Sequence, residues 1–248
     1  MVSYLAASCI GELRKVKEEP CHEQFNKAPN RHAGKKIAFI LCTNNEVYMR
    51  HALYFISKLE VPYGCEVEIL TIQDANSMTG GYNEGMAASS AKYKIYMHQD
   101  VLIINQYFIY DILDIFEDVN VGMIGMVGAP MLSPSKVMWY SDRIGKIYSA
   151  TAYKTDIMKF PPMKGKYESV EVVDGLLMAT QYDIHWREDL FDKWDMYDVS
   201  QSLEFHRRGY EVVVPNMSAP WCLHDDGFMN LDNYYGELDK LKKEYHGE

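Results

Sequence analysis

Apolar stretches of strand length alternate with amphipathic stretches of helix length in the first half of the chain, and this order constrains the fold more than any other feature. Residues 37–42 form an unbroken apolar run, and residues 46–59 repeat large hydrophobic side chains at helical spacing. A second run at 67–72, a helix near 82–91 and a third run at 93–97 continue the pattern. Strand, helix, strand, helix, strand predicts parallel strands joined by crossovers. We therefore predict an α/β protein with a Rossmann-like, mostly parallel sheet flanked by helices.

The rest of the chain has a less regular, mixed pattern. It predicts a helix at 106–118, strands at 121–127 and near 147–153, 170–180 and 212–215, and helices at 198–208 and 231–245. At the other end, the sequence predicts a short helix from about residue 4 to residue 18, followed by a polar stretch with Pro20 and Pro29. We interpret residues 1–34 as an N-terminal appendage and residues 35–248 as one domain.

The charge balance and the cysteines restrict the partners and the location. Among 248 residues, 25 are basic and 35 are acidic, which gives a net charge of 25 minus 35, or −10. This surplus disfavours a broad basic face, so we expect no nucleic-acid partner. The five cysteines form no Cys-x-x-Cys pair, which is typical of reduced thiols in the cytosol. Because no apolar run is long enough to span a bilayer and the start lacks the features of a signal peptide, we expect a cytoplasmic location.

Polar side chains follow each of the three predicted parallel strands, in residues 43–46, 73–76 and 98–100. Ligands of open α/β sheets bind beyond the carboxyl ends of the strands, so these three loops are expected to share one crevice. A glycine-rich phosphate loop is missing, since the glycine pair at 80–81 is too short for one. A bound diphosphate would then need a cation, and a carboxylate at a strand end is suited to hold Mg²⁺ or Mn²⁺. Asp100 is the best candidate for this role.

From about residue 36 to residue 224, the order of these features resembles the GT-A glycosyltransferases, in particular their family 2. The similarity is strongest in residues 81–86 and 88–101. These segments resemble the family's unit of Asn-x-Gly, small-residue helix, hydrophobic strand and Asp-x-Asp. His98 stands where the first aspartate of that motif usually is.

The resemblance implies a GT-A fold with a mixed C-terminal acceptor half, and it implies a role for individual residues. Asp198 matches the catalytic base, and Asp100 and His224 match metal ligands. The residues implied to bind the sugar donor are Asn44, Glu46, Asp74, Asn83, His98 and Gln99. The residues implied to bind the acceptor are Asp174, Gly175 and Asp195.

Structural explanations stand beside these roles. An aspartate at the start of a helix, such as Asp198, is an ordinary N-cap. Asp100 could be a solvated strand end, while Asp74 and Asn44 could shape turns. A histidine near a strand end, such as His98, is usually a hydrogen-bonded structural residue.

These residue types suit a direct displacement at a sugar. A carboxylate within hydrogen-bond reach activates a hydroxyl by taking its proton, and a divalent cation neutralises a departing diphosphate. We therefore predict an inverting, metal-assisted, hexosyltransferase-type glycosyltransferase that acts in carbohydrate biosynthesis. Its donor would be a nucleoside-diphosphate sugar, its acceptor a saccharide, a glycolipid precursor or a small hydroxyl compound, and its cofactor Mn²⁺ or Mg²⁺.

Three further readings stay open at this point. The main alternative is a catalytically inactive module that binds a nucleotide or a carbohydrate on the same fold. A nucleotidyltransferase is disfavoured because the basic, glycine-rich opening for a triphosphate is missing. A homodimer is also left open.

Overall fold

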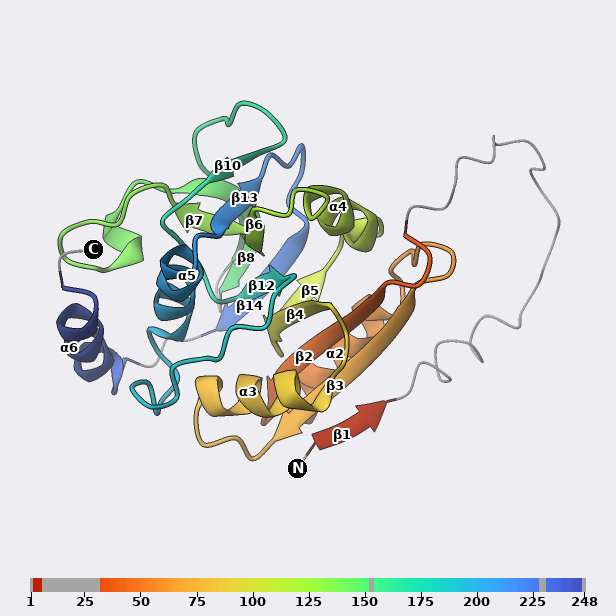
Figure 1. The fold of residues 1–248 in the computed structure, drawn as a ribbon, viewed down its shortest axis with the longest axis horizontal. Helices are drawn as coiled ribbons and strands as arrows, with labels where there is room; N and C mark the ends of the chain where they lie inside the picture. Colours follow the sequence, from red (N-terminus) through yellow and green to blue (C-terminus); the bar gives the residue numbers. More distant parts are fainter. Residues whose placement is uncertain (1, 6–31, 152–153, 228–230, 247–248) are drawn as a thin grey trace, which may run out of the picture.

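The structure is a computed structural model that describes residues 2–5, 32–151, 154–227 and 231–246 (Figure 1). Its strands form an eight-stranded sheet and a smaller six-stranded sheet. In spatial order the large sheet consists of β1 (Val2–Leu5), β3 (Glu66–Gln73), β2 (Lys36–Thr43), β4 (Tyr93–His98), β12 (Leu177–Thr180), β6 (Val121–Gly125), β13 (Glu211–Pro215) and β10 (Tyr167–Ser169). The small sheet consists of β11 (Val172–Val173), β7 (Val127–Ala129), β8 (Ile144–Thr151), β14 (Cys222–Gly227) and β5 (Val101–Ile103), with β9 (Thr155–Lys159) beside β8.

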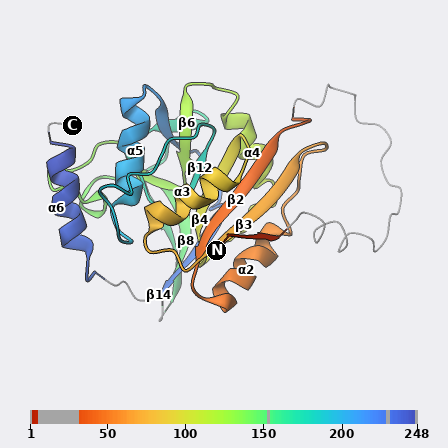
Figure 2. The same ribbon diagram turned by 60° about the horizontal axis from the view of Figure 1, so that its bottom comes forward.

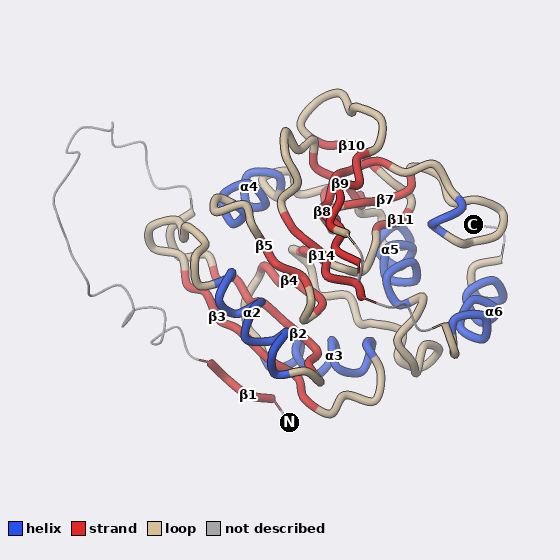
Figure 3. Tube along the Cα trace, turned by 180° about the vertical axis from the view of Figure 1, so that it is seen from behind, coloured by secondary structure: helices blue, strands red, loops and turns tan. Residues whose placement is uncertain are grey.

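Helices cover both faces of the large sheet, and the last helix packs against one of these helices. The helices are α2 (Glu46–Ile56), α3 (Met78–Ala88), α4 (Phe108–Ile115), α5 (Tyr197–Arg207) and α6 (Tyr234–Glu244), together with the short 3₁₀ helix η1 (Met138–Tyr140). Figures 1 and 3 show α3 and α2 on opposite faces of strands β2 and β3. Figure 2 shows α5 and α6 side by side at the end of the molecule that is remote from β1. Among the described residues, no helix combines the length and the apolar character that a bilayer crossing requires.

The parallel core confirms the predicted α/β class. Strand β2 runs parallel to both β3 and β4, with Cys42 opposite Ile72 on one side and opposite His98 on the other. One set of alternate β2 residues, which includes Phe39, packs with α2 and α4, and the other set, which includes Ile40, packs with α3. Burial on both faces explains why residues 37–42 of β2 form a continuous apolar run in the sequence.

Two glycines allow α3 to lie close to β2. A Cβ atom at Gly85 would be 2.4 Å from Ile40 Cγ2, and one at Gly81 would be 2.5 Å from Cys42 Sγ. The helix begins at Met78 because Ser77 caps it, accepting a hydrogen bond from the Gly80 N–H at 3.0 Å. The cap and the glycines fix α3 against the end of β2 where the polar loops emerge.

This close approach makes a stability prediction. We expect Gly85→Ala to lower the free energy of unfolding by about 1–3 kcal/mol, because the added methyl group overpacks the contact with Ile40. Gly236→Ala in α6 is the matched control, since a Cβ there meets nothing within 4 Å, and it should raise that free energy by about 0.5–1 kcal/mol. Urea unfolding measures both variants. Equal changes in the two would contradict this account of the packing.

Several sequence predictions are wrong in detail. The helix predicted from about residue 4 is wrong at its start, because Tyr4 and Leu5 belong to β1, which pairs antiparallel with β3. The remainder of that predicted helix lies outside the described residues. The predicted strand at 121–127 is two strands, β6 and β7, which belong to different sheets. The predicted strand at 170–180 is likewise divided into β11 and β12. The first crossing leaves no signal in the hydrophobicity because its single residue, Met126, is itself buried and apolar. The second crossing contains Asp174 and Gly175, which interrupt the apolar run.

Candidate functional site

The loops after the three parallel strands meet in one cleft, as the strand order predicts. A cavity of about 270 Å³ opens at this edge of the sheet. It is lined by Cys42, Thr43 and Asn44 after β2, by Ile72, Asp74, Ala75 and Met78 between β3 and α3, by His98, Gln99 and Asp100 after β4, and by Trp194. Four of the six predicted donor-binding residues, Asn44, Asp74, His98 and Gln99, are therefore in the lining.

Gln99 ties two of these loops together. Its side-chain oxygen accepts hydrogen bonds from the backbone N–H groups of Asn44 at 3.0 Å and Asn45 at 2.9 Å. Its Nε2 donates to Asn44 Oδ1 at 2.6 Å. Asn45 in turn caps α2 by accepting from the N–H of Val47. The rim of the cleft is thus held in place by hydrogen bonds from two neighbouring strand ends.

The loop after β3 carries an unusual backbone conformation. Asp74 has a φ of 58°, in the left-handed region that costs a residue with a Cβ about 1–2 kcal/mol. Aspartate tolerates this region better than most residues. Asp74 therefore both shapes the turn and lines the cleft.

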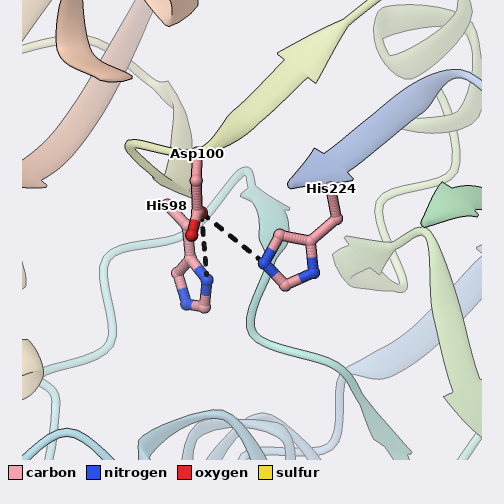
Figure 4. A group of neighbouring side chains, drawn as sticks. All are labelled: His98, Asp100 and His224. Atoms are coloured by element: carbon pink, nitrogen blue, oxygen red, sulfur yellow. Dashed lines mark ion pairs between the residues drawn. The ribbon is translucent and has the colours of Figure 1, made fainter. Parts of the chain in front are cut away.

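His98, Asp100 and His224 converge on one point beside the cleft (Figure 4). Asp100 Oδ1 lies 3.5 Å from His224 Nε2 and 3.9 Å from His98 Nδ1. One potential ligand atom from each residue lies within 4.8 Å of the other two. His224 reaches this point because β14 pairs antiparallel with β5, which places His224 opposite Val101. His224 is therefore inside a strand of the small sheet.

The electrostatics of this cluster favour a bound cation. Burial disfavours the charged form of Asp100, but the neighbouring His224 and His98 outweigh it and hold the Asp100 pKa below its usual value. Burial and the nearby His224 lower the pKa of His98. Asp100 Oδ1 is buried and has no well-formed hydrogen bond within the described part of the chain, since the imidazole nitrogens that face it lie 3.5 and 3.9 Å away. Since a buried acceptor is normally paired, an ionised oxygen left open beside two imidazoles fits a metal ligand.

Asp198 lies in the first turn of α5, next to a second carboxylate. Its two side-chain oxygens accept hydrogen bonds from the backbone N–H groups of Gly175 at 3.0 Å and Val199 at 2.8 Å. Asp174 is buried, and its Oδ1 accepts from the Leu176 N–H at 2.9 Å. Burial and the negative charge of Asp174 raise the Asp198 pKa to about 7. A carboxyl group with this pKa can exchange a proton near neutral pH, as general acid–base catalysis requires.

The N-cap explanation of Asp198 is wrong. The cap residue of α5 is Met196, and no side chain caps the helix there. Met196 has a φ of 59°, again in the left-handed region. The helix begins directly after this turn, and in its first turn Asp198 accepts the hydrogen bond from Gly175. Backbone strain of this kind is retained where the surrounding structure holds it, often at functional sites.

Tyr197 connects Asp198 to the histidine cluster, and the sequence alone did not identify it. Its hydroxyl is hydrogen-bonded to His98 Nε2. Its ring fills the space that a side chain at Gly175 would occupy, since a Cβ there would be 2.2 Å from the Tyr197 hydroxyl. Asp198 itself is not among the cleft-lining side chains, but its neighbour Tyr197 is hydrogen-bonded to one of them, His98.

The remaining predicted residues are placed differently. Glu46 is exposed at the start of α2 and pairs with Arg50 at 2.5 Å, outside the cleft lining. Asn83 is buried in α3, where its amide accepts from the Trp186 N–H at 2.9 Å and donates to the Trp186 carbonyl at 3.0 Å. Asn83 thus has a structural task and no place in the cleft.

The segment before α5 carries the last two residues of interest. Asp195 is partly exposed, and burial together with the charge of Glu237 raises its pKa. Trp194 is 43% exposed and contributes an aromatic face to the cleft. Trp194 is a single aromatic residue in a loop, and no periodic pattern in the sequence predicts its place in the cleft.

Comparison with known proteins supports the fold. The sequence model of the family described as "Glycosyltransferase like family" matches residues 38–245. Three solved structures are similar. S. aureus TarS has a TM-score of 0.51 at 11% identity, covering 82% of this chain and 38% of its own. The mannosyltransferase PcManGT from Pyrobaculum calidifontis, in complex with GDP-Man and Mn²⁺, has a TM-score of 0.51 at 12% identity, covering 81% of this chain and 59% of its own.

The third is S. aureus TarS 1–349 in complex with UDP-GlcNAc, with a TM-score of 0.52 at 8% identity, covering 82% of this chain and 64% of its own. At these identities the similarity shows the fold, which is that of GT-A glycosyltransferases. The chain spans less than two thirds of the length of each of these three structures. No curated protein matches the sequence.

Proposed function

Because the chain belongs to the glycosyltransferase-like family, we propose that its cleft binds a nucleoside-diphosphate sugar and that Asp198 activates the hydroxyl that attacks the sugar. One observation carries the proposal. A cluster of three potential metal ligands at the edge of the cleft lies one side chain, Tyr197, away from a carboxyl group whose pKa is about 7. An open site for a cation beside a proton acceptor is the arrangement that sugar transfer from a diphosphate needs.

The donor would lie across the three strand ends. In similar structures the bound donors are GDP-Man with Mn²⁺ and UDP-GlcNAc, which are nucleoside-diphosphate hexoses. In this chain Asp74, Asn44 and Gln99 offer hydrogen-bonding groups to a base or ribose, and Trp194 offers a face for stacking. Asp100 and His224 would hold a divalent cation, which supplies positive charge to the leaving diphosphate.

The chain's own residues would then perform the displacement. The acceptor hydroxyl hydrogen-bonds to Asp198, which takes its proton as the oxygen attacks the anomeric carbon from the face opposite the diphosphate. One base and one attacking oxygen give inversion in a single displacement. The N–H groups of Gly175 and Val199 keep the carboxylate oriented during the transfer. Asp174 raises the pKa of Asp198, and Asp195, which is partly exposed just before α5, is the residue we assign to the acceptor.

Binding of the donor tests the first half of the proposal. We expect calorimetric titration with uridine, guanosine or thymidine diphosphate in the presence of Mn²⁺ to show binding of at least one of them. Asp74→Ala should weaken it about 10–100-fold, the effect of losing a hydrogen bond to a charged group. Asp239→Ala is the matched control: it is the same substitution at an exposed position of α6 outside the cleft lining, and it should leave the affinity unchanged. Absence of heat with all three diphosphates would contradict the proposal.

Turnover separates the enzyme from its main alternative. His98 replaces an acidic residue of the family's motif, which favours an inactive binding module as the second candidate. Transfer or hydrolysis of a bound nucleotide sugar, assayed over many saccharide and small hydroxyl acceptors, is expected of the enzyme. Binding without any turnover is expected of the module.

A further inference from the structure

The three potential metal ligands that cluster among the described residues are two imidazoles and a single carboxylate, and such a donor set has its own cation preference. We propose that His98 is a direct ligand through Nδ1 and that the cluster of His98, Asp100 and His224 selects a nitrogen-preferring transition-metal dication of the Zn²⁺ or Co²⁺ type over Mg²⁺. The inference deepens the proposed function, on which it rests for what the cation does in the cleft.

The first support is the position of His98. Its Nδ1 lies 3.9 Å from Asp100 Oδ1, and His224 Nε2 lies 3.5 Å from the same oxygen. The sheets hold all three residues: His98 ends β4, Asp100 lies in the turn to β5, and His224 lies in β14 beside β5. The Asp225 N–H also donates to the Asp100 carbonyl at 3.0 Å, which ties the turn to β14. Because strands and a short turn hold these three residues in place, we expect all three side chains to contact a cation bound between them.

The second support is the hydrogen bond from Tyr197. The Tyr197 hydroxyl is bonded to His98 Nε2, the nitrogen that points away from Asp100. In the tautomer whose Nε2–H donates to this hydroxyl, Nδ1 carries a lone pair directed at the cluster. Metal-binding histidines almost always have their other ring nitrogen held by such a partner, which fixes the tautomer and the ring orientation. Tyr197 therefore acts as a positioning residue for His98.

The third support is the open carboxylate. Asp100 Oδ1 is buried and faces both imidazoles, His224 Nε2 at 3.5 Å and His98 Nδ1 at 3.9 Å, distances too long for well-formed hydrogen bonds within the described residues. Carboxylate and water oxygens suit Mg²⁺ and Mn²⁺, whereas imidazole nitrogens suit Zn²⁺, Co²⁺ and Fe²⁺. With His98 in the place of an acid, two of the three protein ligands are nitrogens and the site carries one negative charge fewer. Both changes act against Mg²⁺, which binds through hard oxygens and dehydrates reluctantly.

The test is a Co²⁺ titration of the untagged, full-length protein after chelation, followed through the visible absorption bands of bound Co²⁺ and in the absence of nucleotide. We expect saturable Co²⁺ bands, displacement by equimolar Zn²⁺, and no displacement by Mg²⁺ at about a thousandfold excess. His98→Asp should lower Co²⁺ affinity at least about tenfold and reduce the preference for Zn²⁺ over Mn²⁺ by a similar factor. His51→Asp, the same substitution at an exposed position of α2, is the control and should bind as the wild type.

Tyr197→Phe tests the positioning role while keeping the ring in place. It should lower Co²⁺ affinity about 10–100-fold and shift the absorption bands, and circular dichroism should show an intact fold. If His98→Asp fails to fold, this variant decides the matter. The inference is overturned if either variant, correctly folded, binds Co²⁺ as the wild type does, or if Mg²⁺ displaces Co²⁺ as readily as Zn²⁺ does. A protein that binds Co²⁺ as expected but no nucleoside diphosphate would refute the proposed function and leave the cation preference standing.

Discussion

Asp198→Asn is expected to slow sugar transfer about 10²–10⁴-fold and to leave donor affinity unchanged within about twofold, because a general base contributes to the transition state and not to donor binding. Asparagine is nearly the same size and can still accept one of the two backbone hydrogen bonds, from Gly175 or Val199. It cannot take a proton from the acceptor. Steady-state transfer kinetics, combined with calorimetry of the bound nucleotide, measure the two effects separately.

Asp192→Asn is the matched control for this prediction. Asp192 is an exposed acid a few residues before α5, and it pairs with Lys240 at 2.7 Å. Its replacement should leave transfer at the wild-type rate, since it approaches neither the cleft nor Asp198. If Asp198→Asn transfers sugar as fast as the control, Asp198 is not the base.

The rate of transfer should fall about tenfold for each pH unit below 7 and level off above it. Burial and the charge of Asp174 raise the Asp198 pKa to about 7, so at pH 5 only about 1% of the molecules carry the ionised base. The expected loss between pH 8 and pH 5 is therefore about a hundredfold. Asp174→Asn removes the like charge and should move the midpoint to lower pH. The dependence of kcat/KM on pH measures both midpoints, and a wild-type midpoint near pH 4 would refute the assignment.

The same raised pKa affects stability with a definite sign. The folded protein binds the Asp198 proton more tightly than the unfolded chain, so the native state loses stability as the pH rises from about 4 to 7. An asparagine at this position carries no charge that must be buried. Asp198→Asn should therefore be more stable than the wild type at pH 8, and the difference should vanish near pH 4. A gain in stability with a loss of transfer is the signature of a residue kept for chemistry.

The parallel half of the fold could be predicted because its physical cause is local. Strands such as β2 are buried on both faces, so each appears as one apolar run, and the helices between them keep a periodic apolar face. The small sheet could not be predicted in the same way. Strand β14 pairs with β5 across more than a hundred residues of sequence, and neither strand is long or strongly patterned. Pairing of this kind depends on the tertiary structure and leaves no local signal.

In the candidate site, too, the residues that follow predicted strands could be placed from the sequence, and those brought in by tertiary packing could not. Asp74 and Asp100 could be placed in one cleft from the strand order alone, since parallel strands end at a common edge. His98 was predicted to bind the donor, and the structure places it in the cleft lining and also beside Asp100 and His224. Tyr197 was missed because its contact with His98 joins α5 to β4, and only the packing around Gly175 directs its ring there.

The most direct test of the account is a crystal structure of this protein with a nucleoside diphosphate and a transition-metal cation. The account predicts the nucleotide in the cleft between Asp74 and Trp194, the diphosphate and the cation at His98, Asp100 and His224, and Asp198 facing the end of the diphosphate where the sugar is attached. A nucleotide bound elsewhere on the molecule, or a diphosphate whose sugar end points away from Asp198, would contradict it.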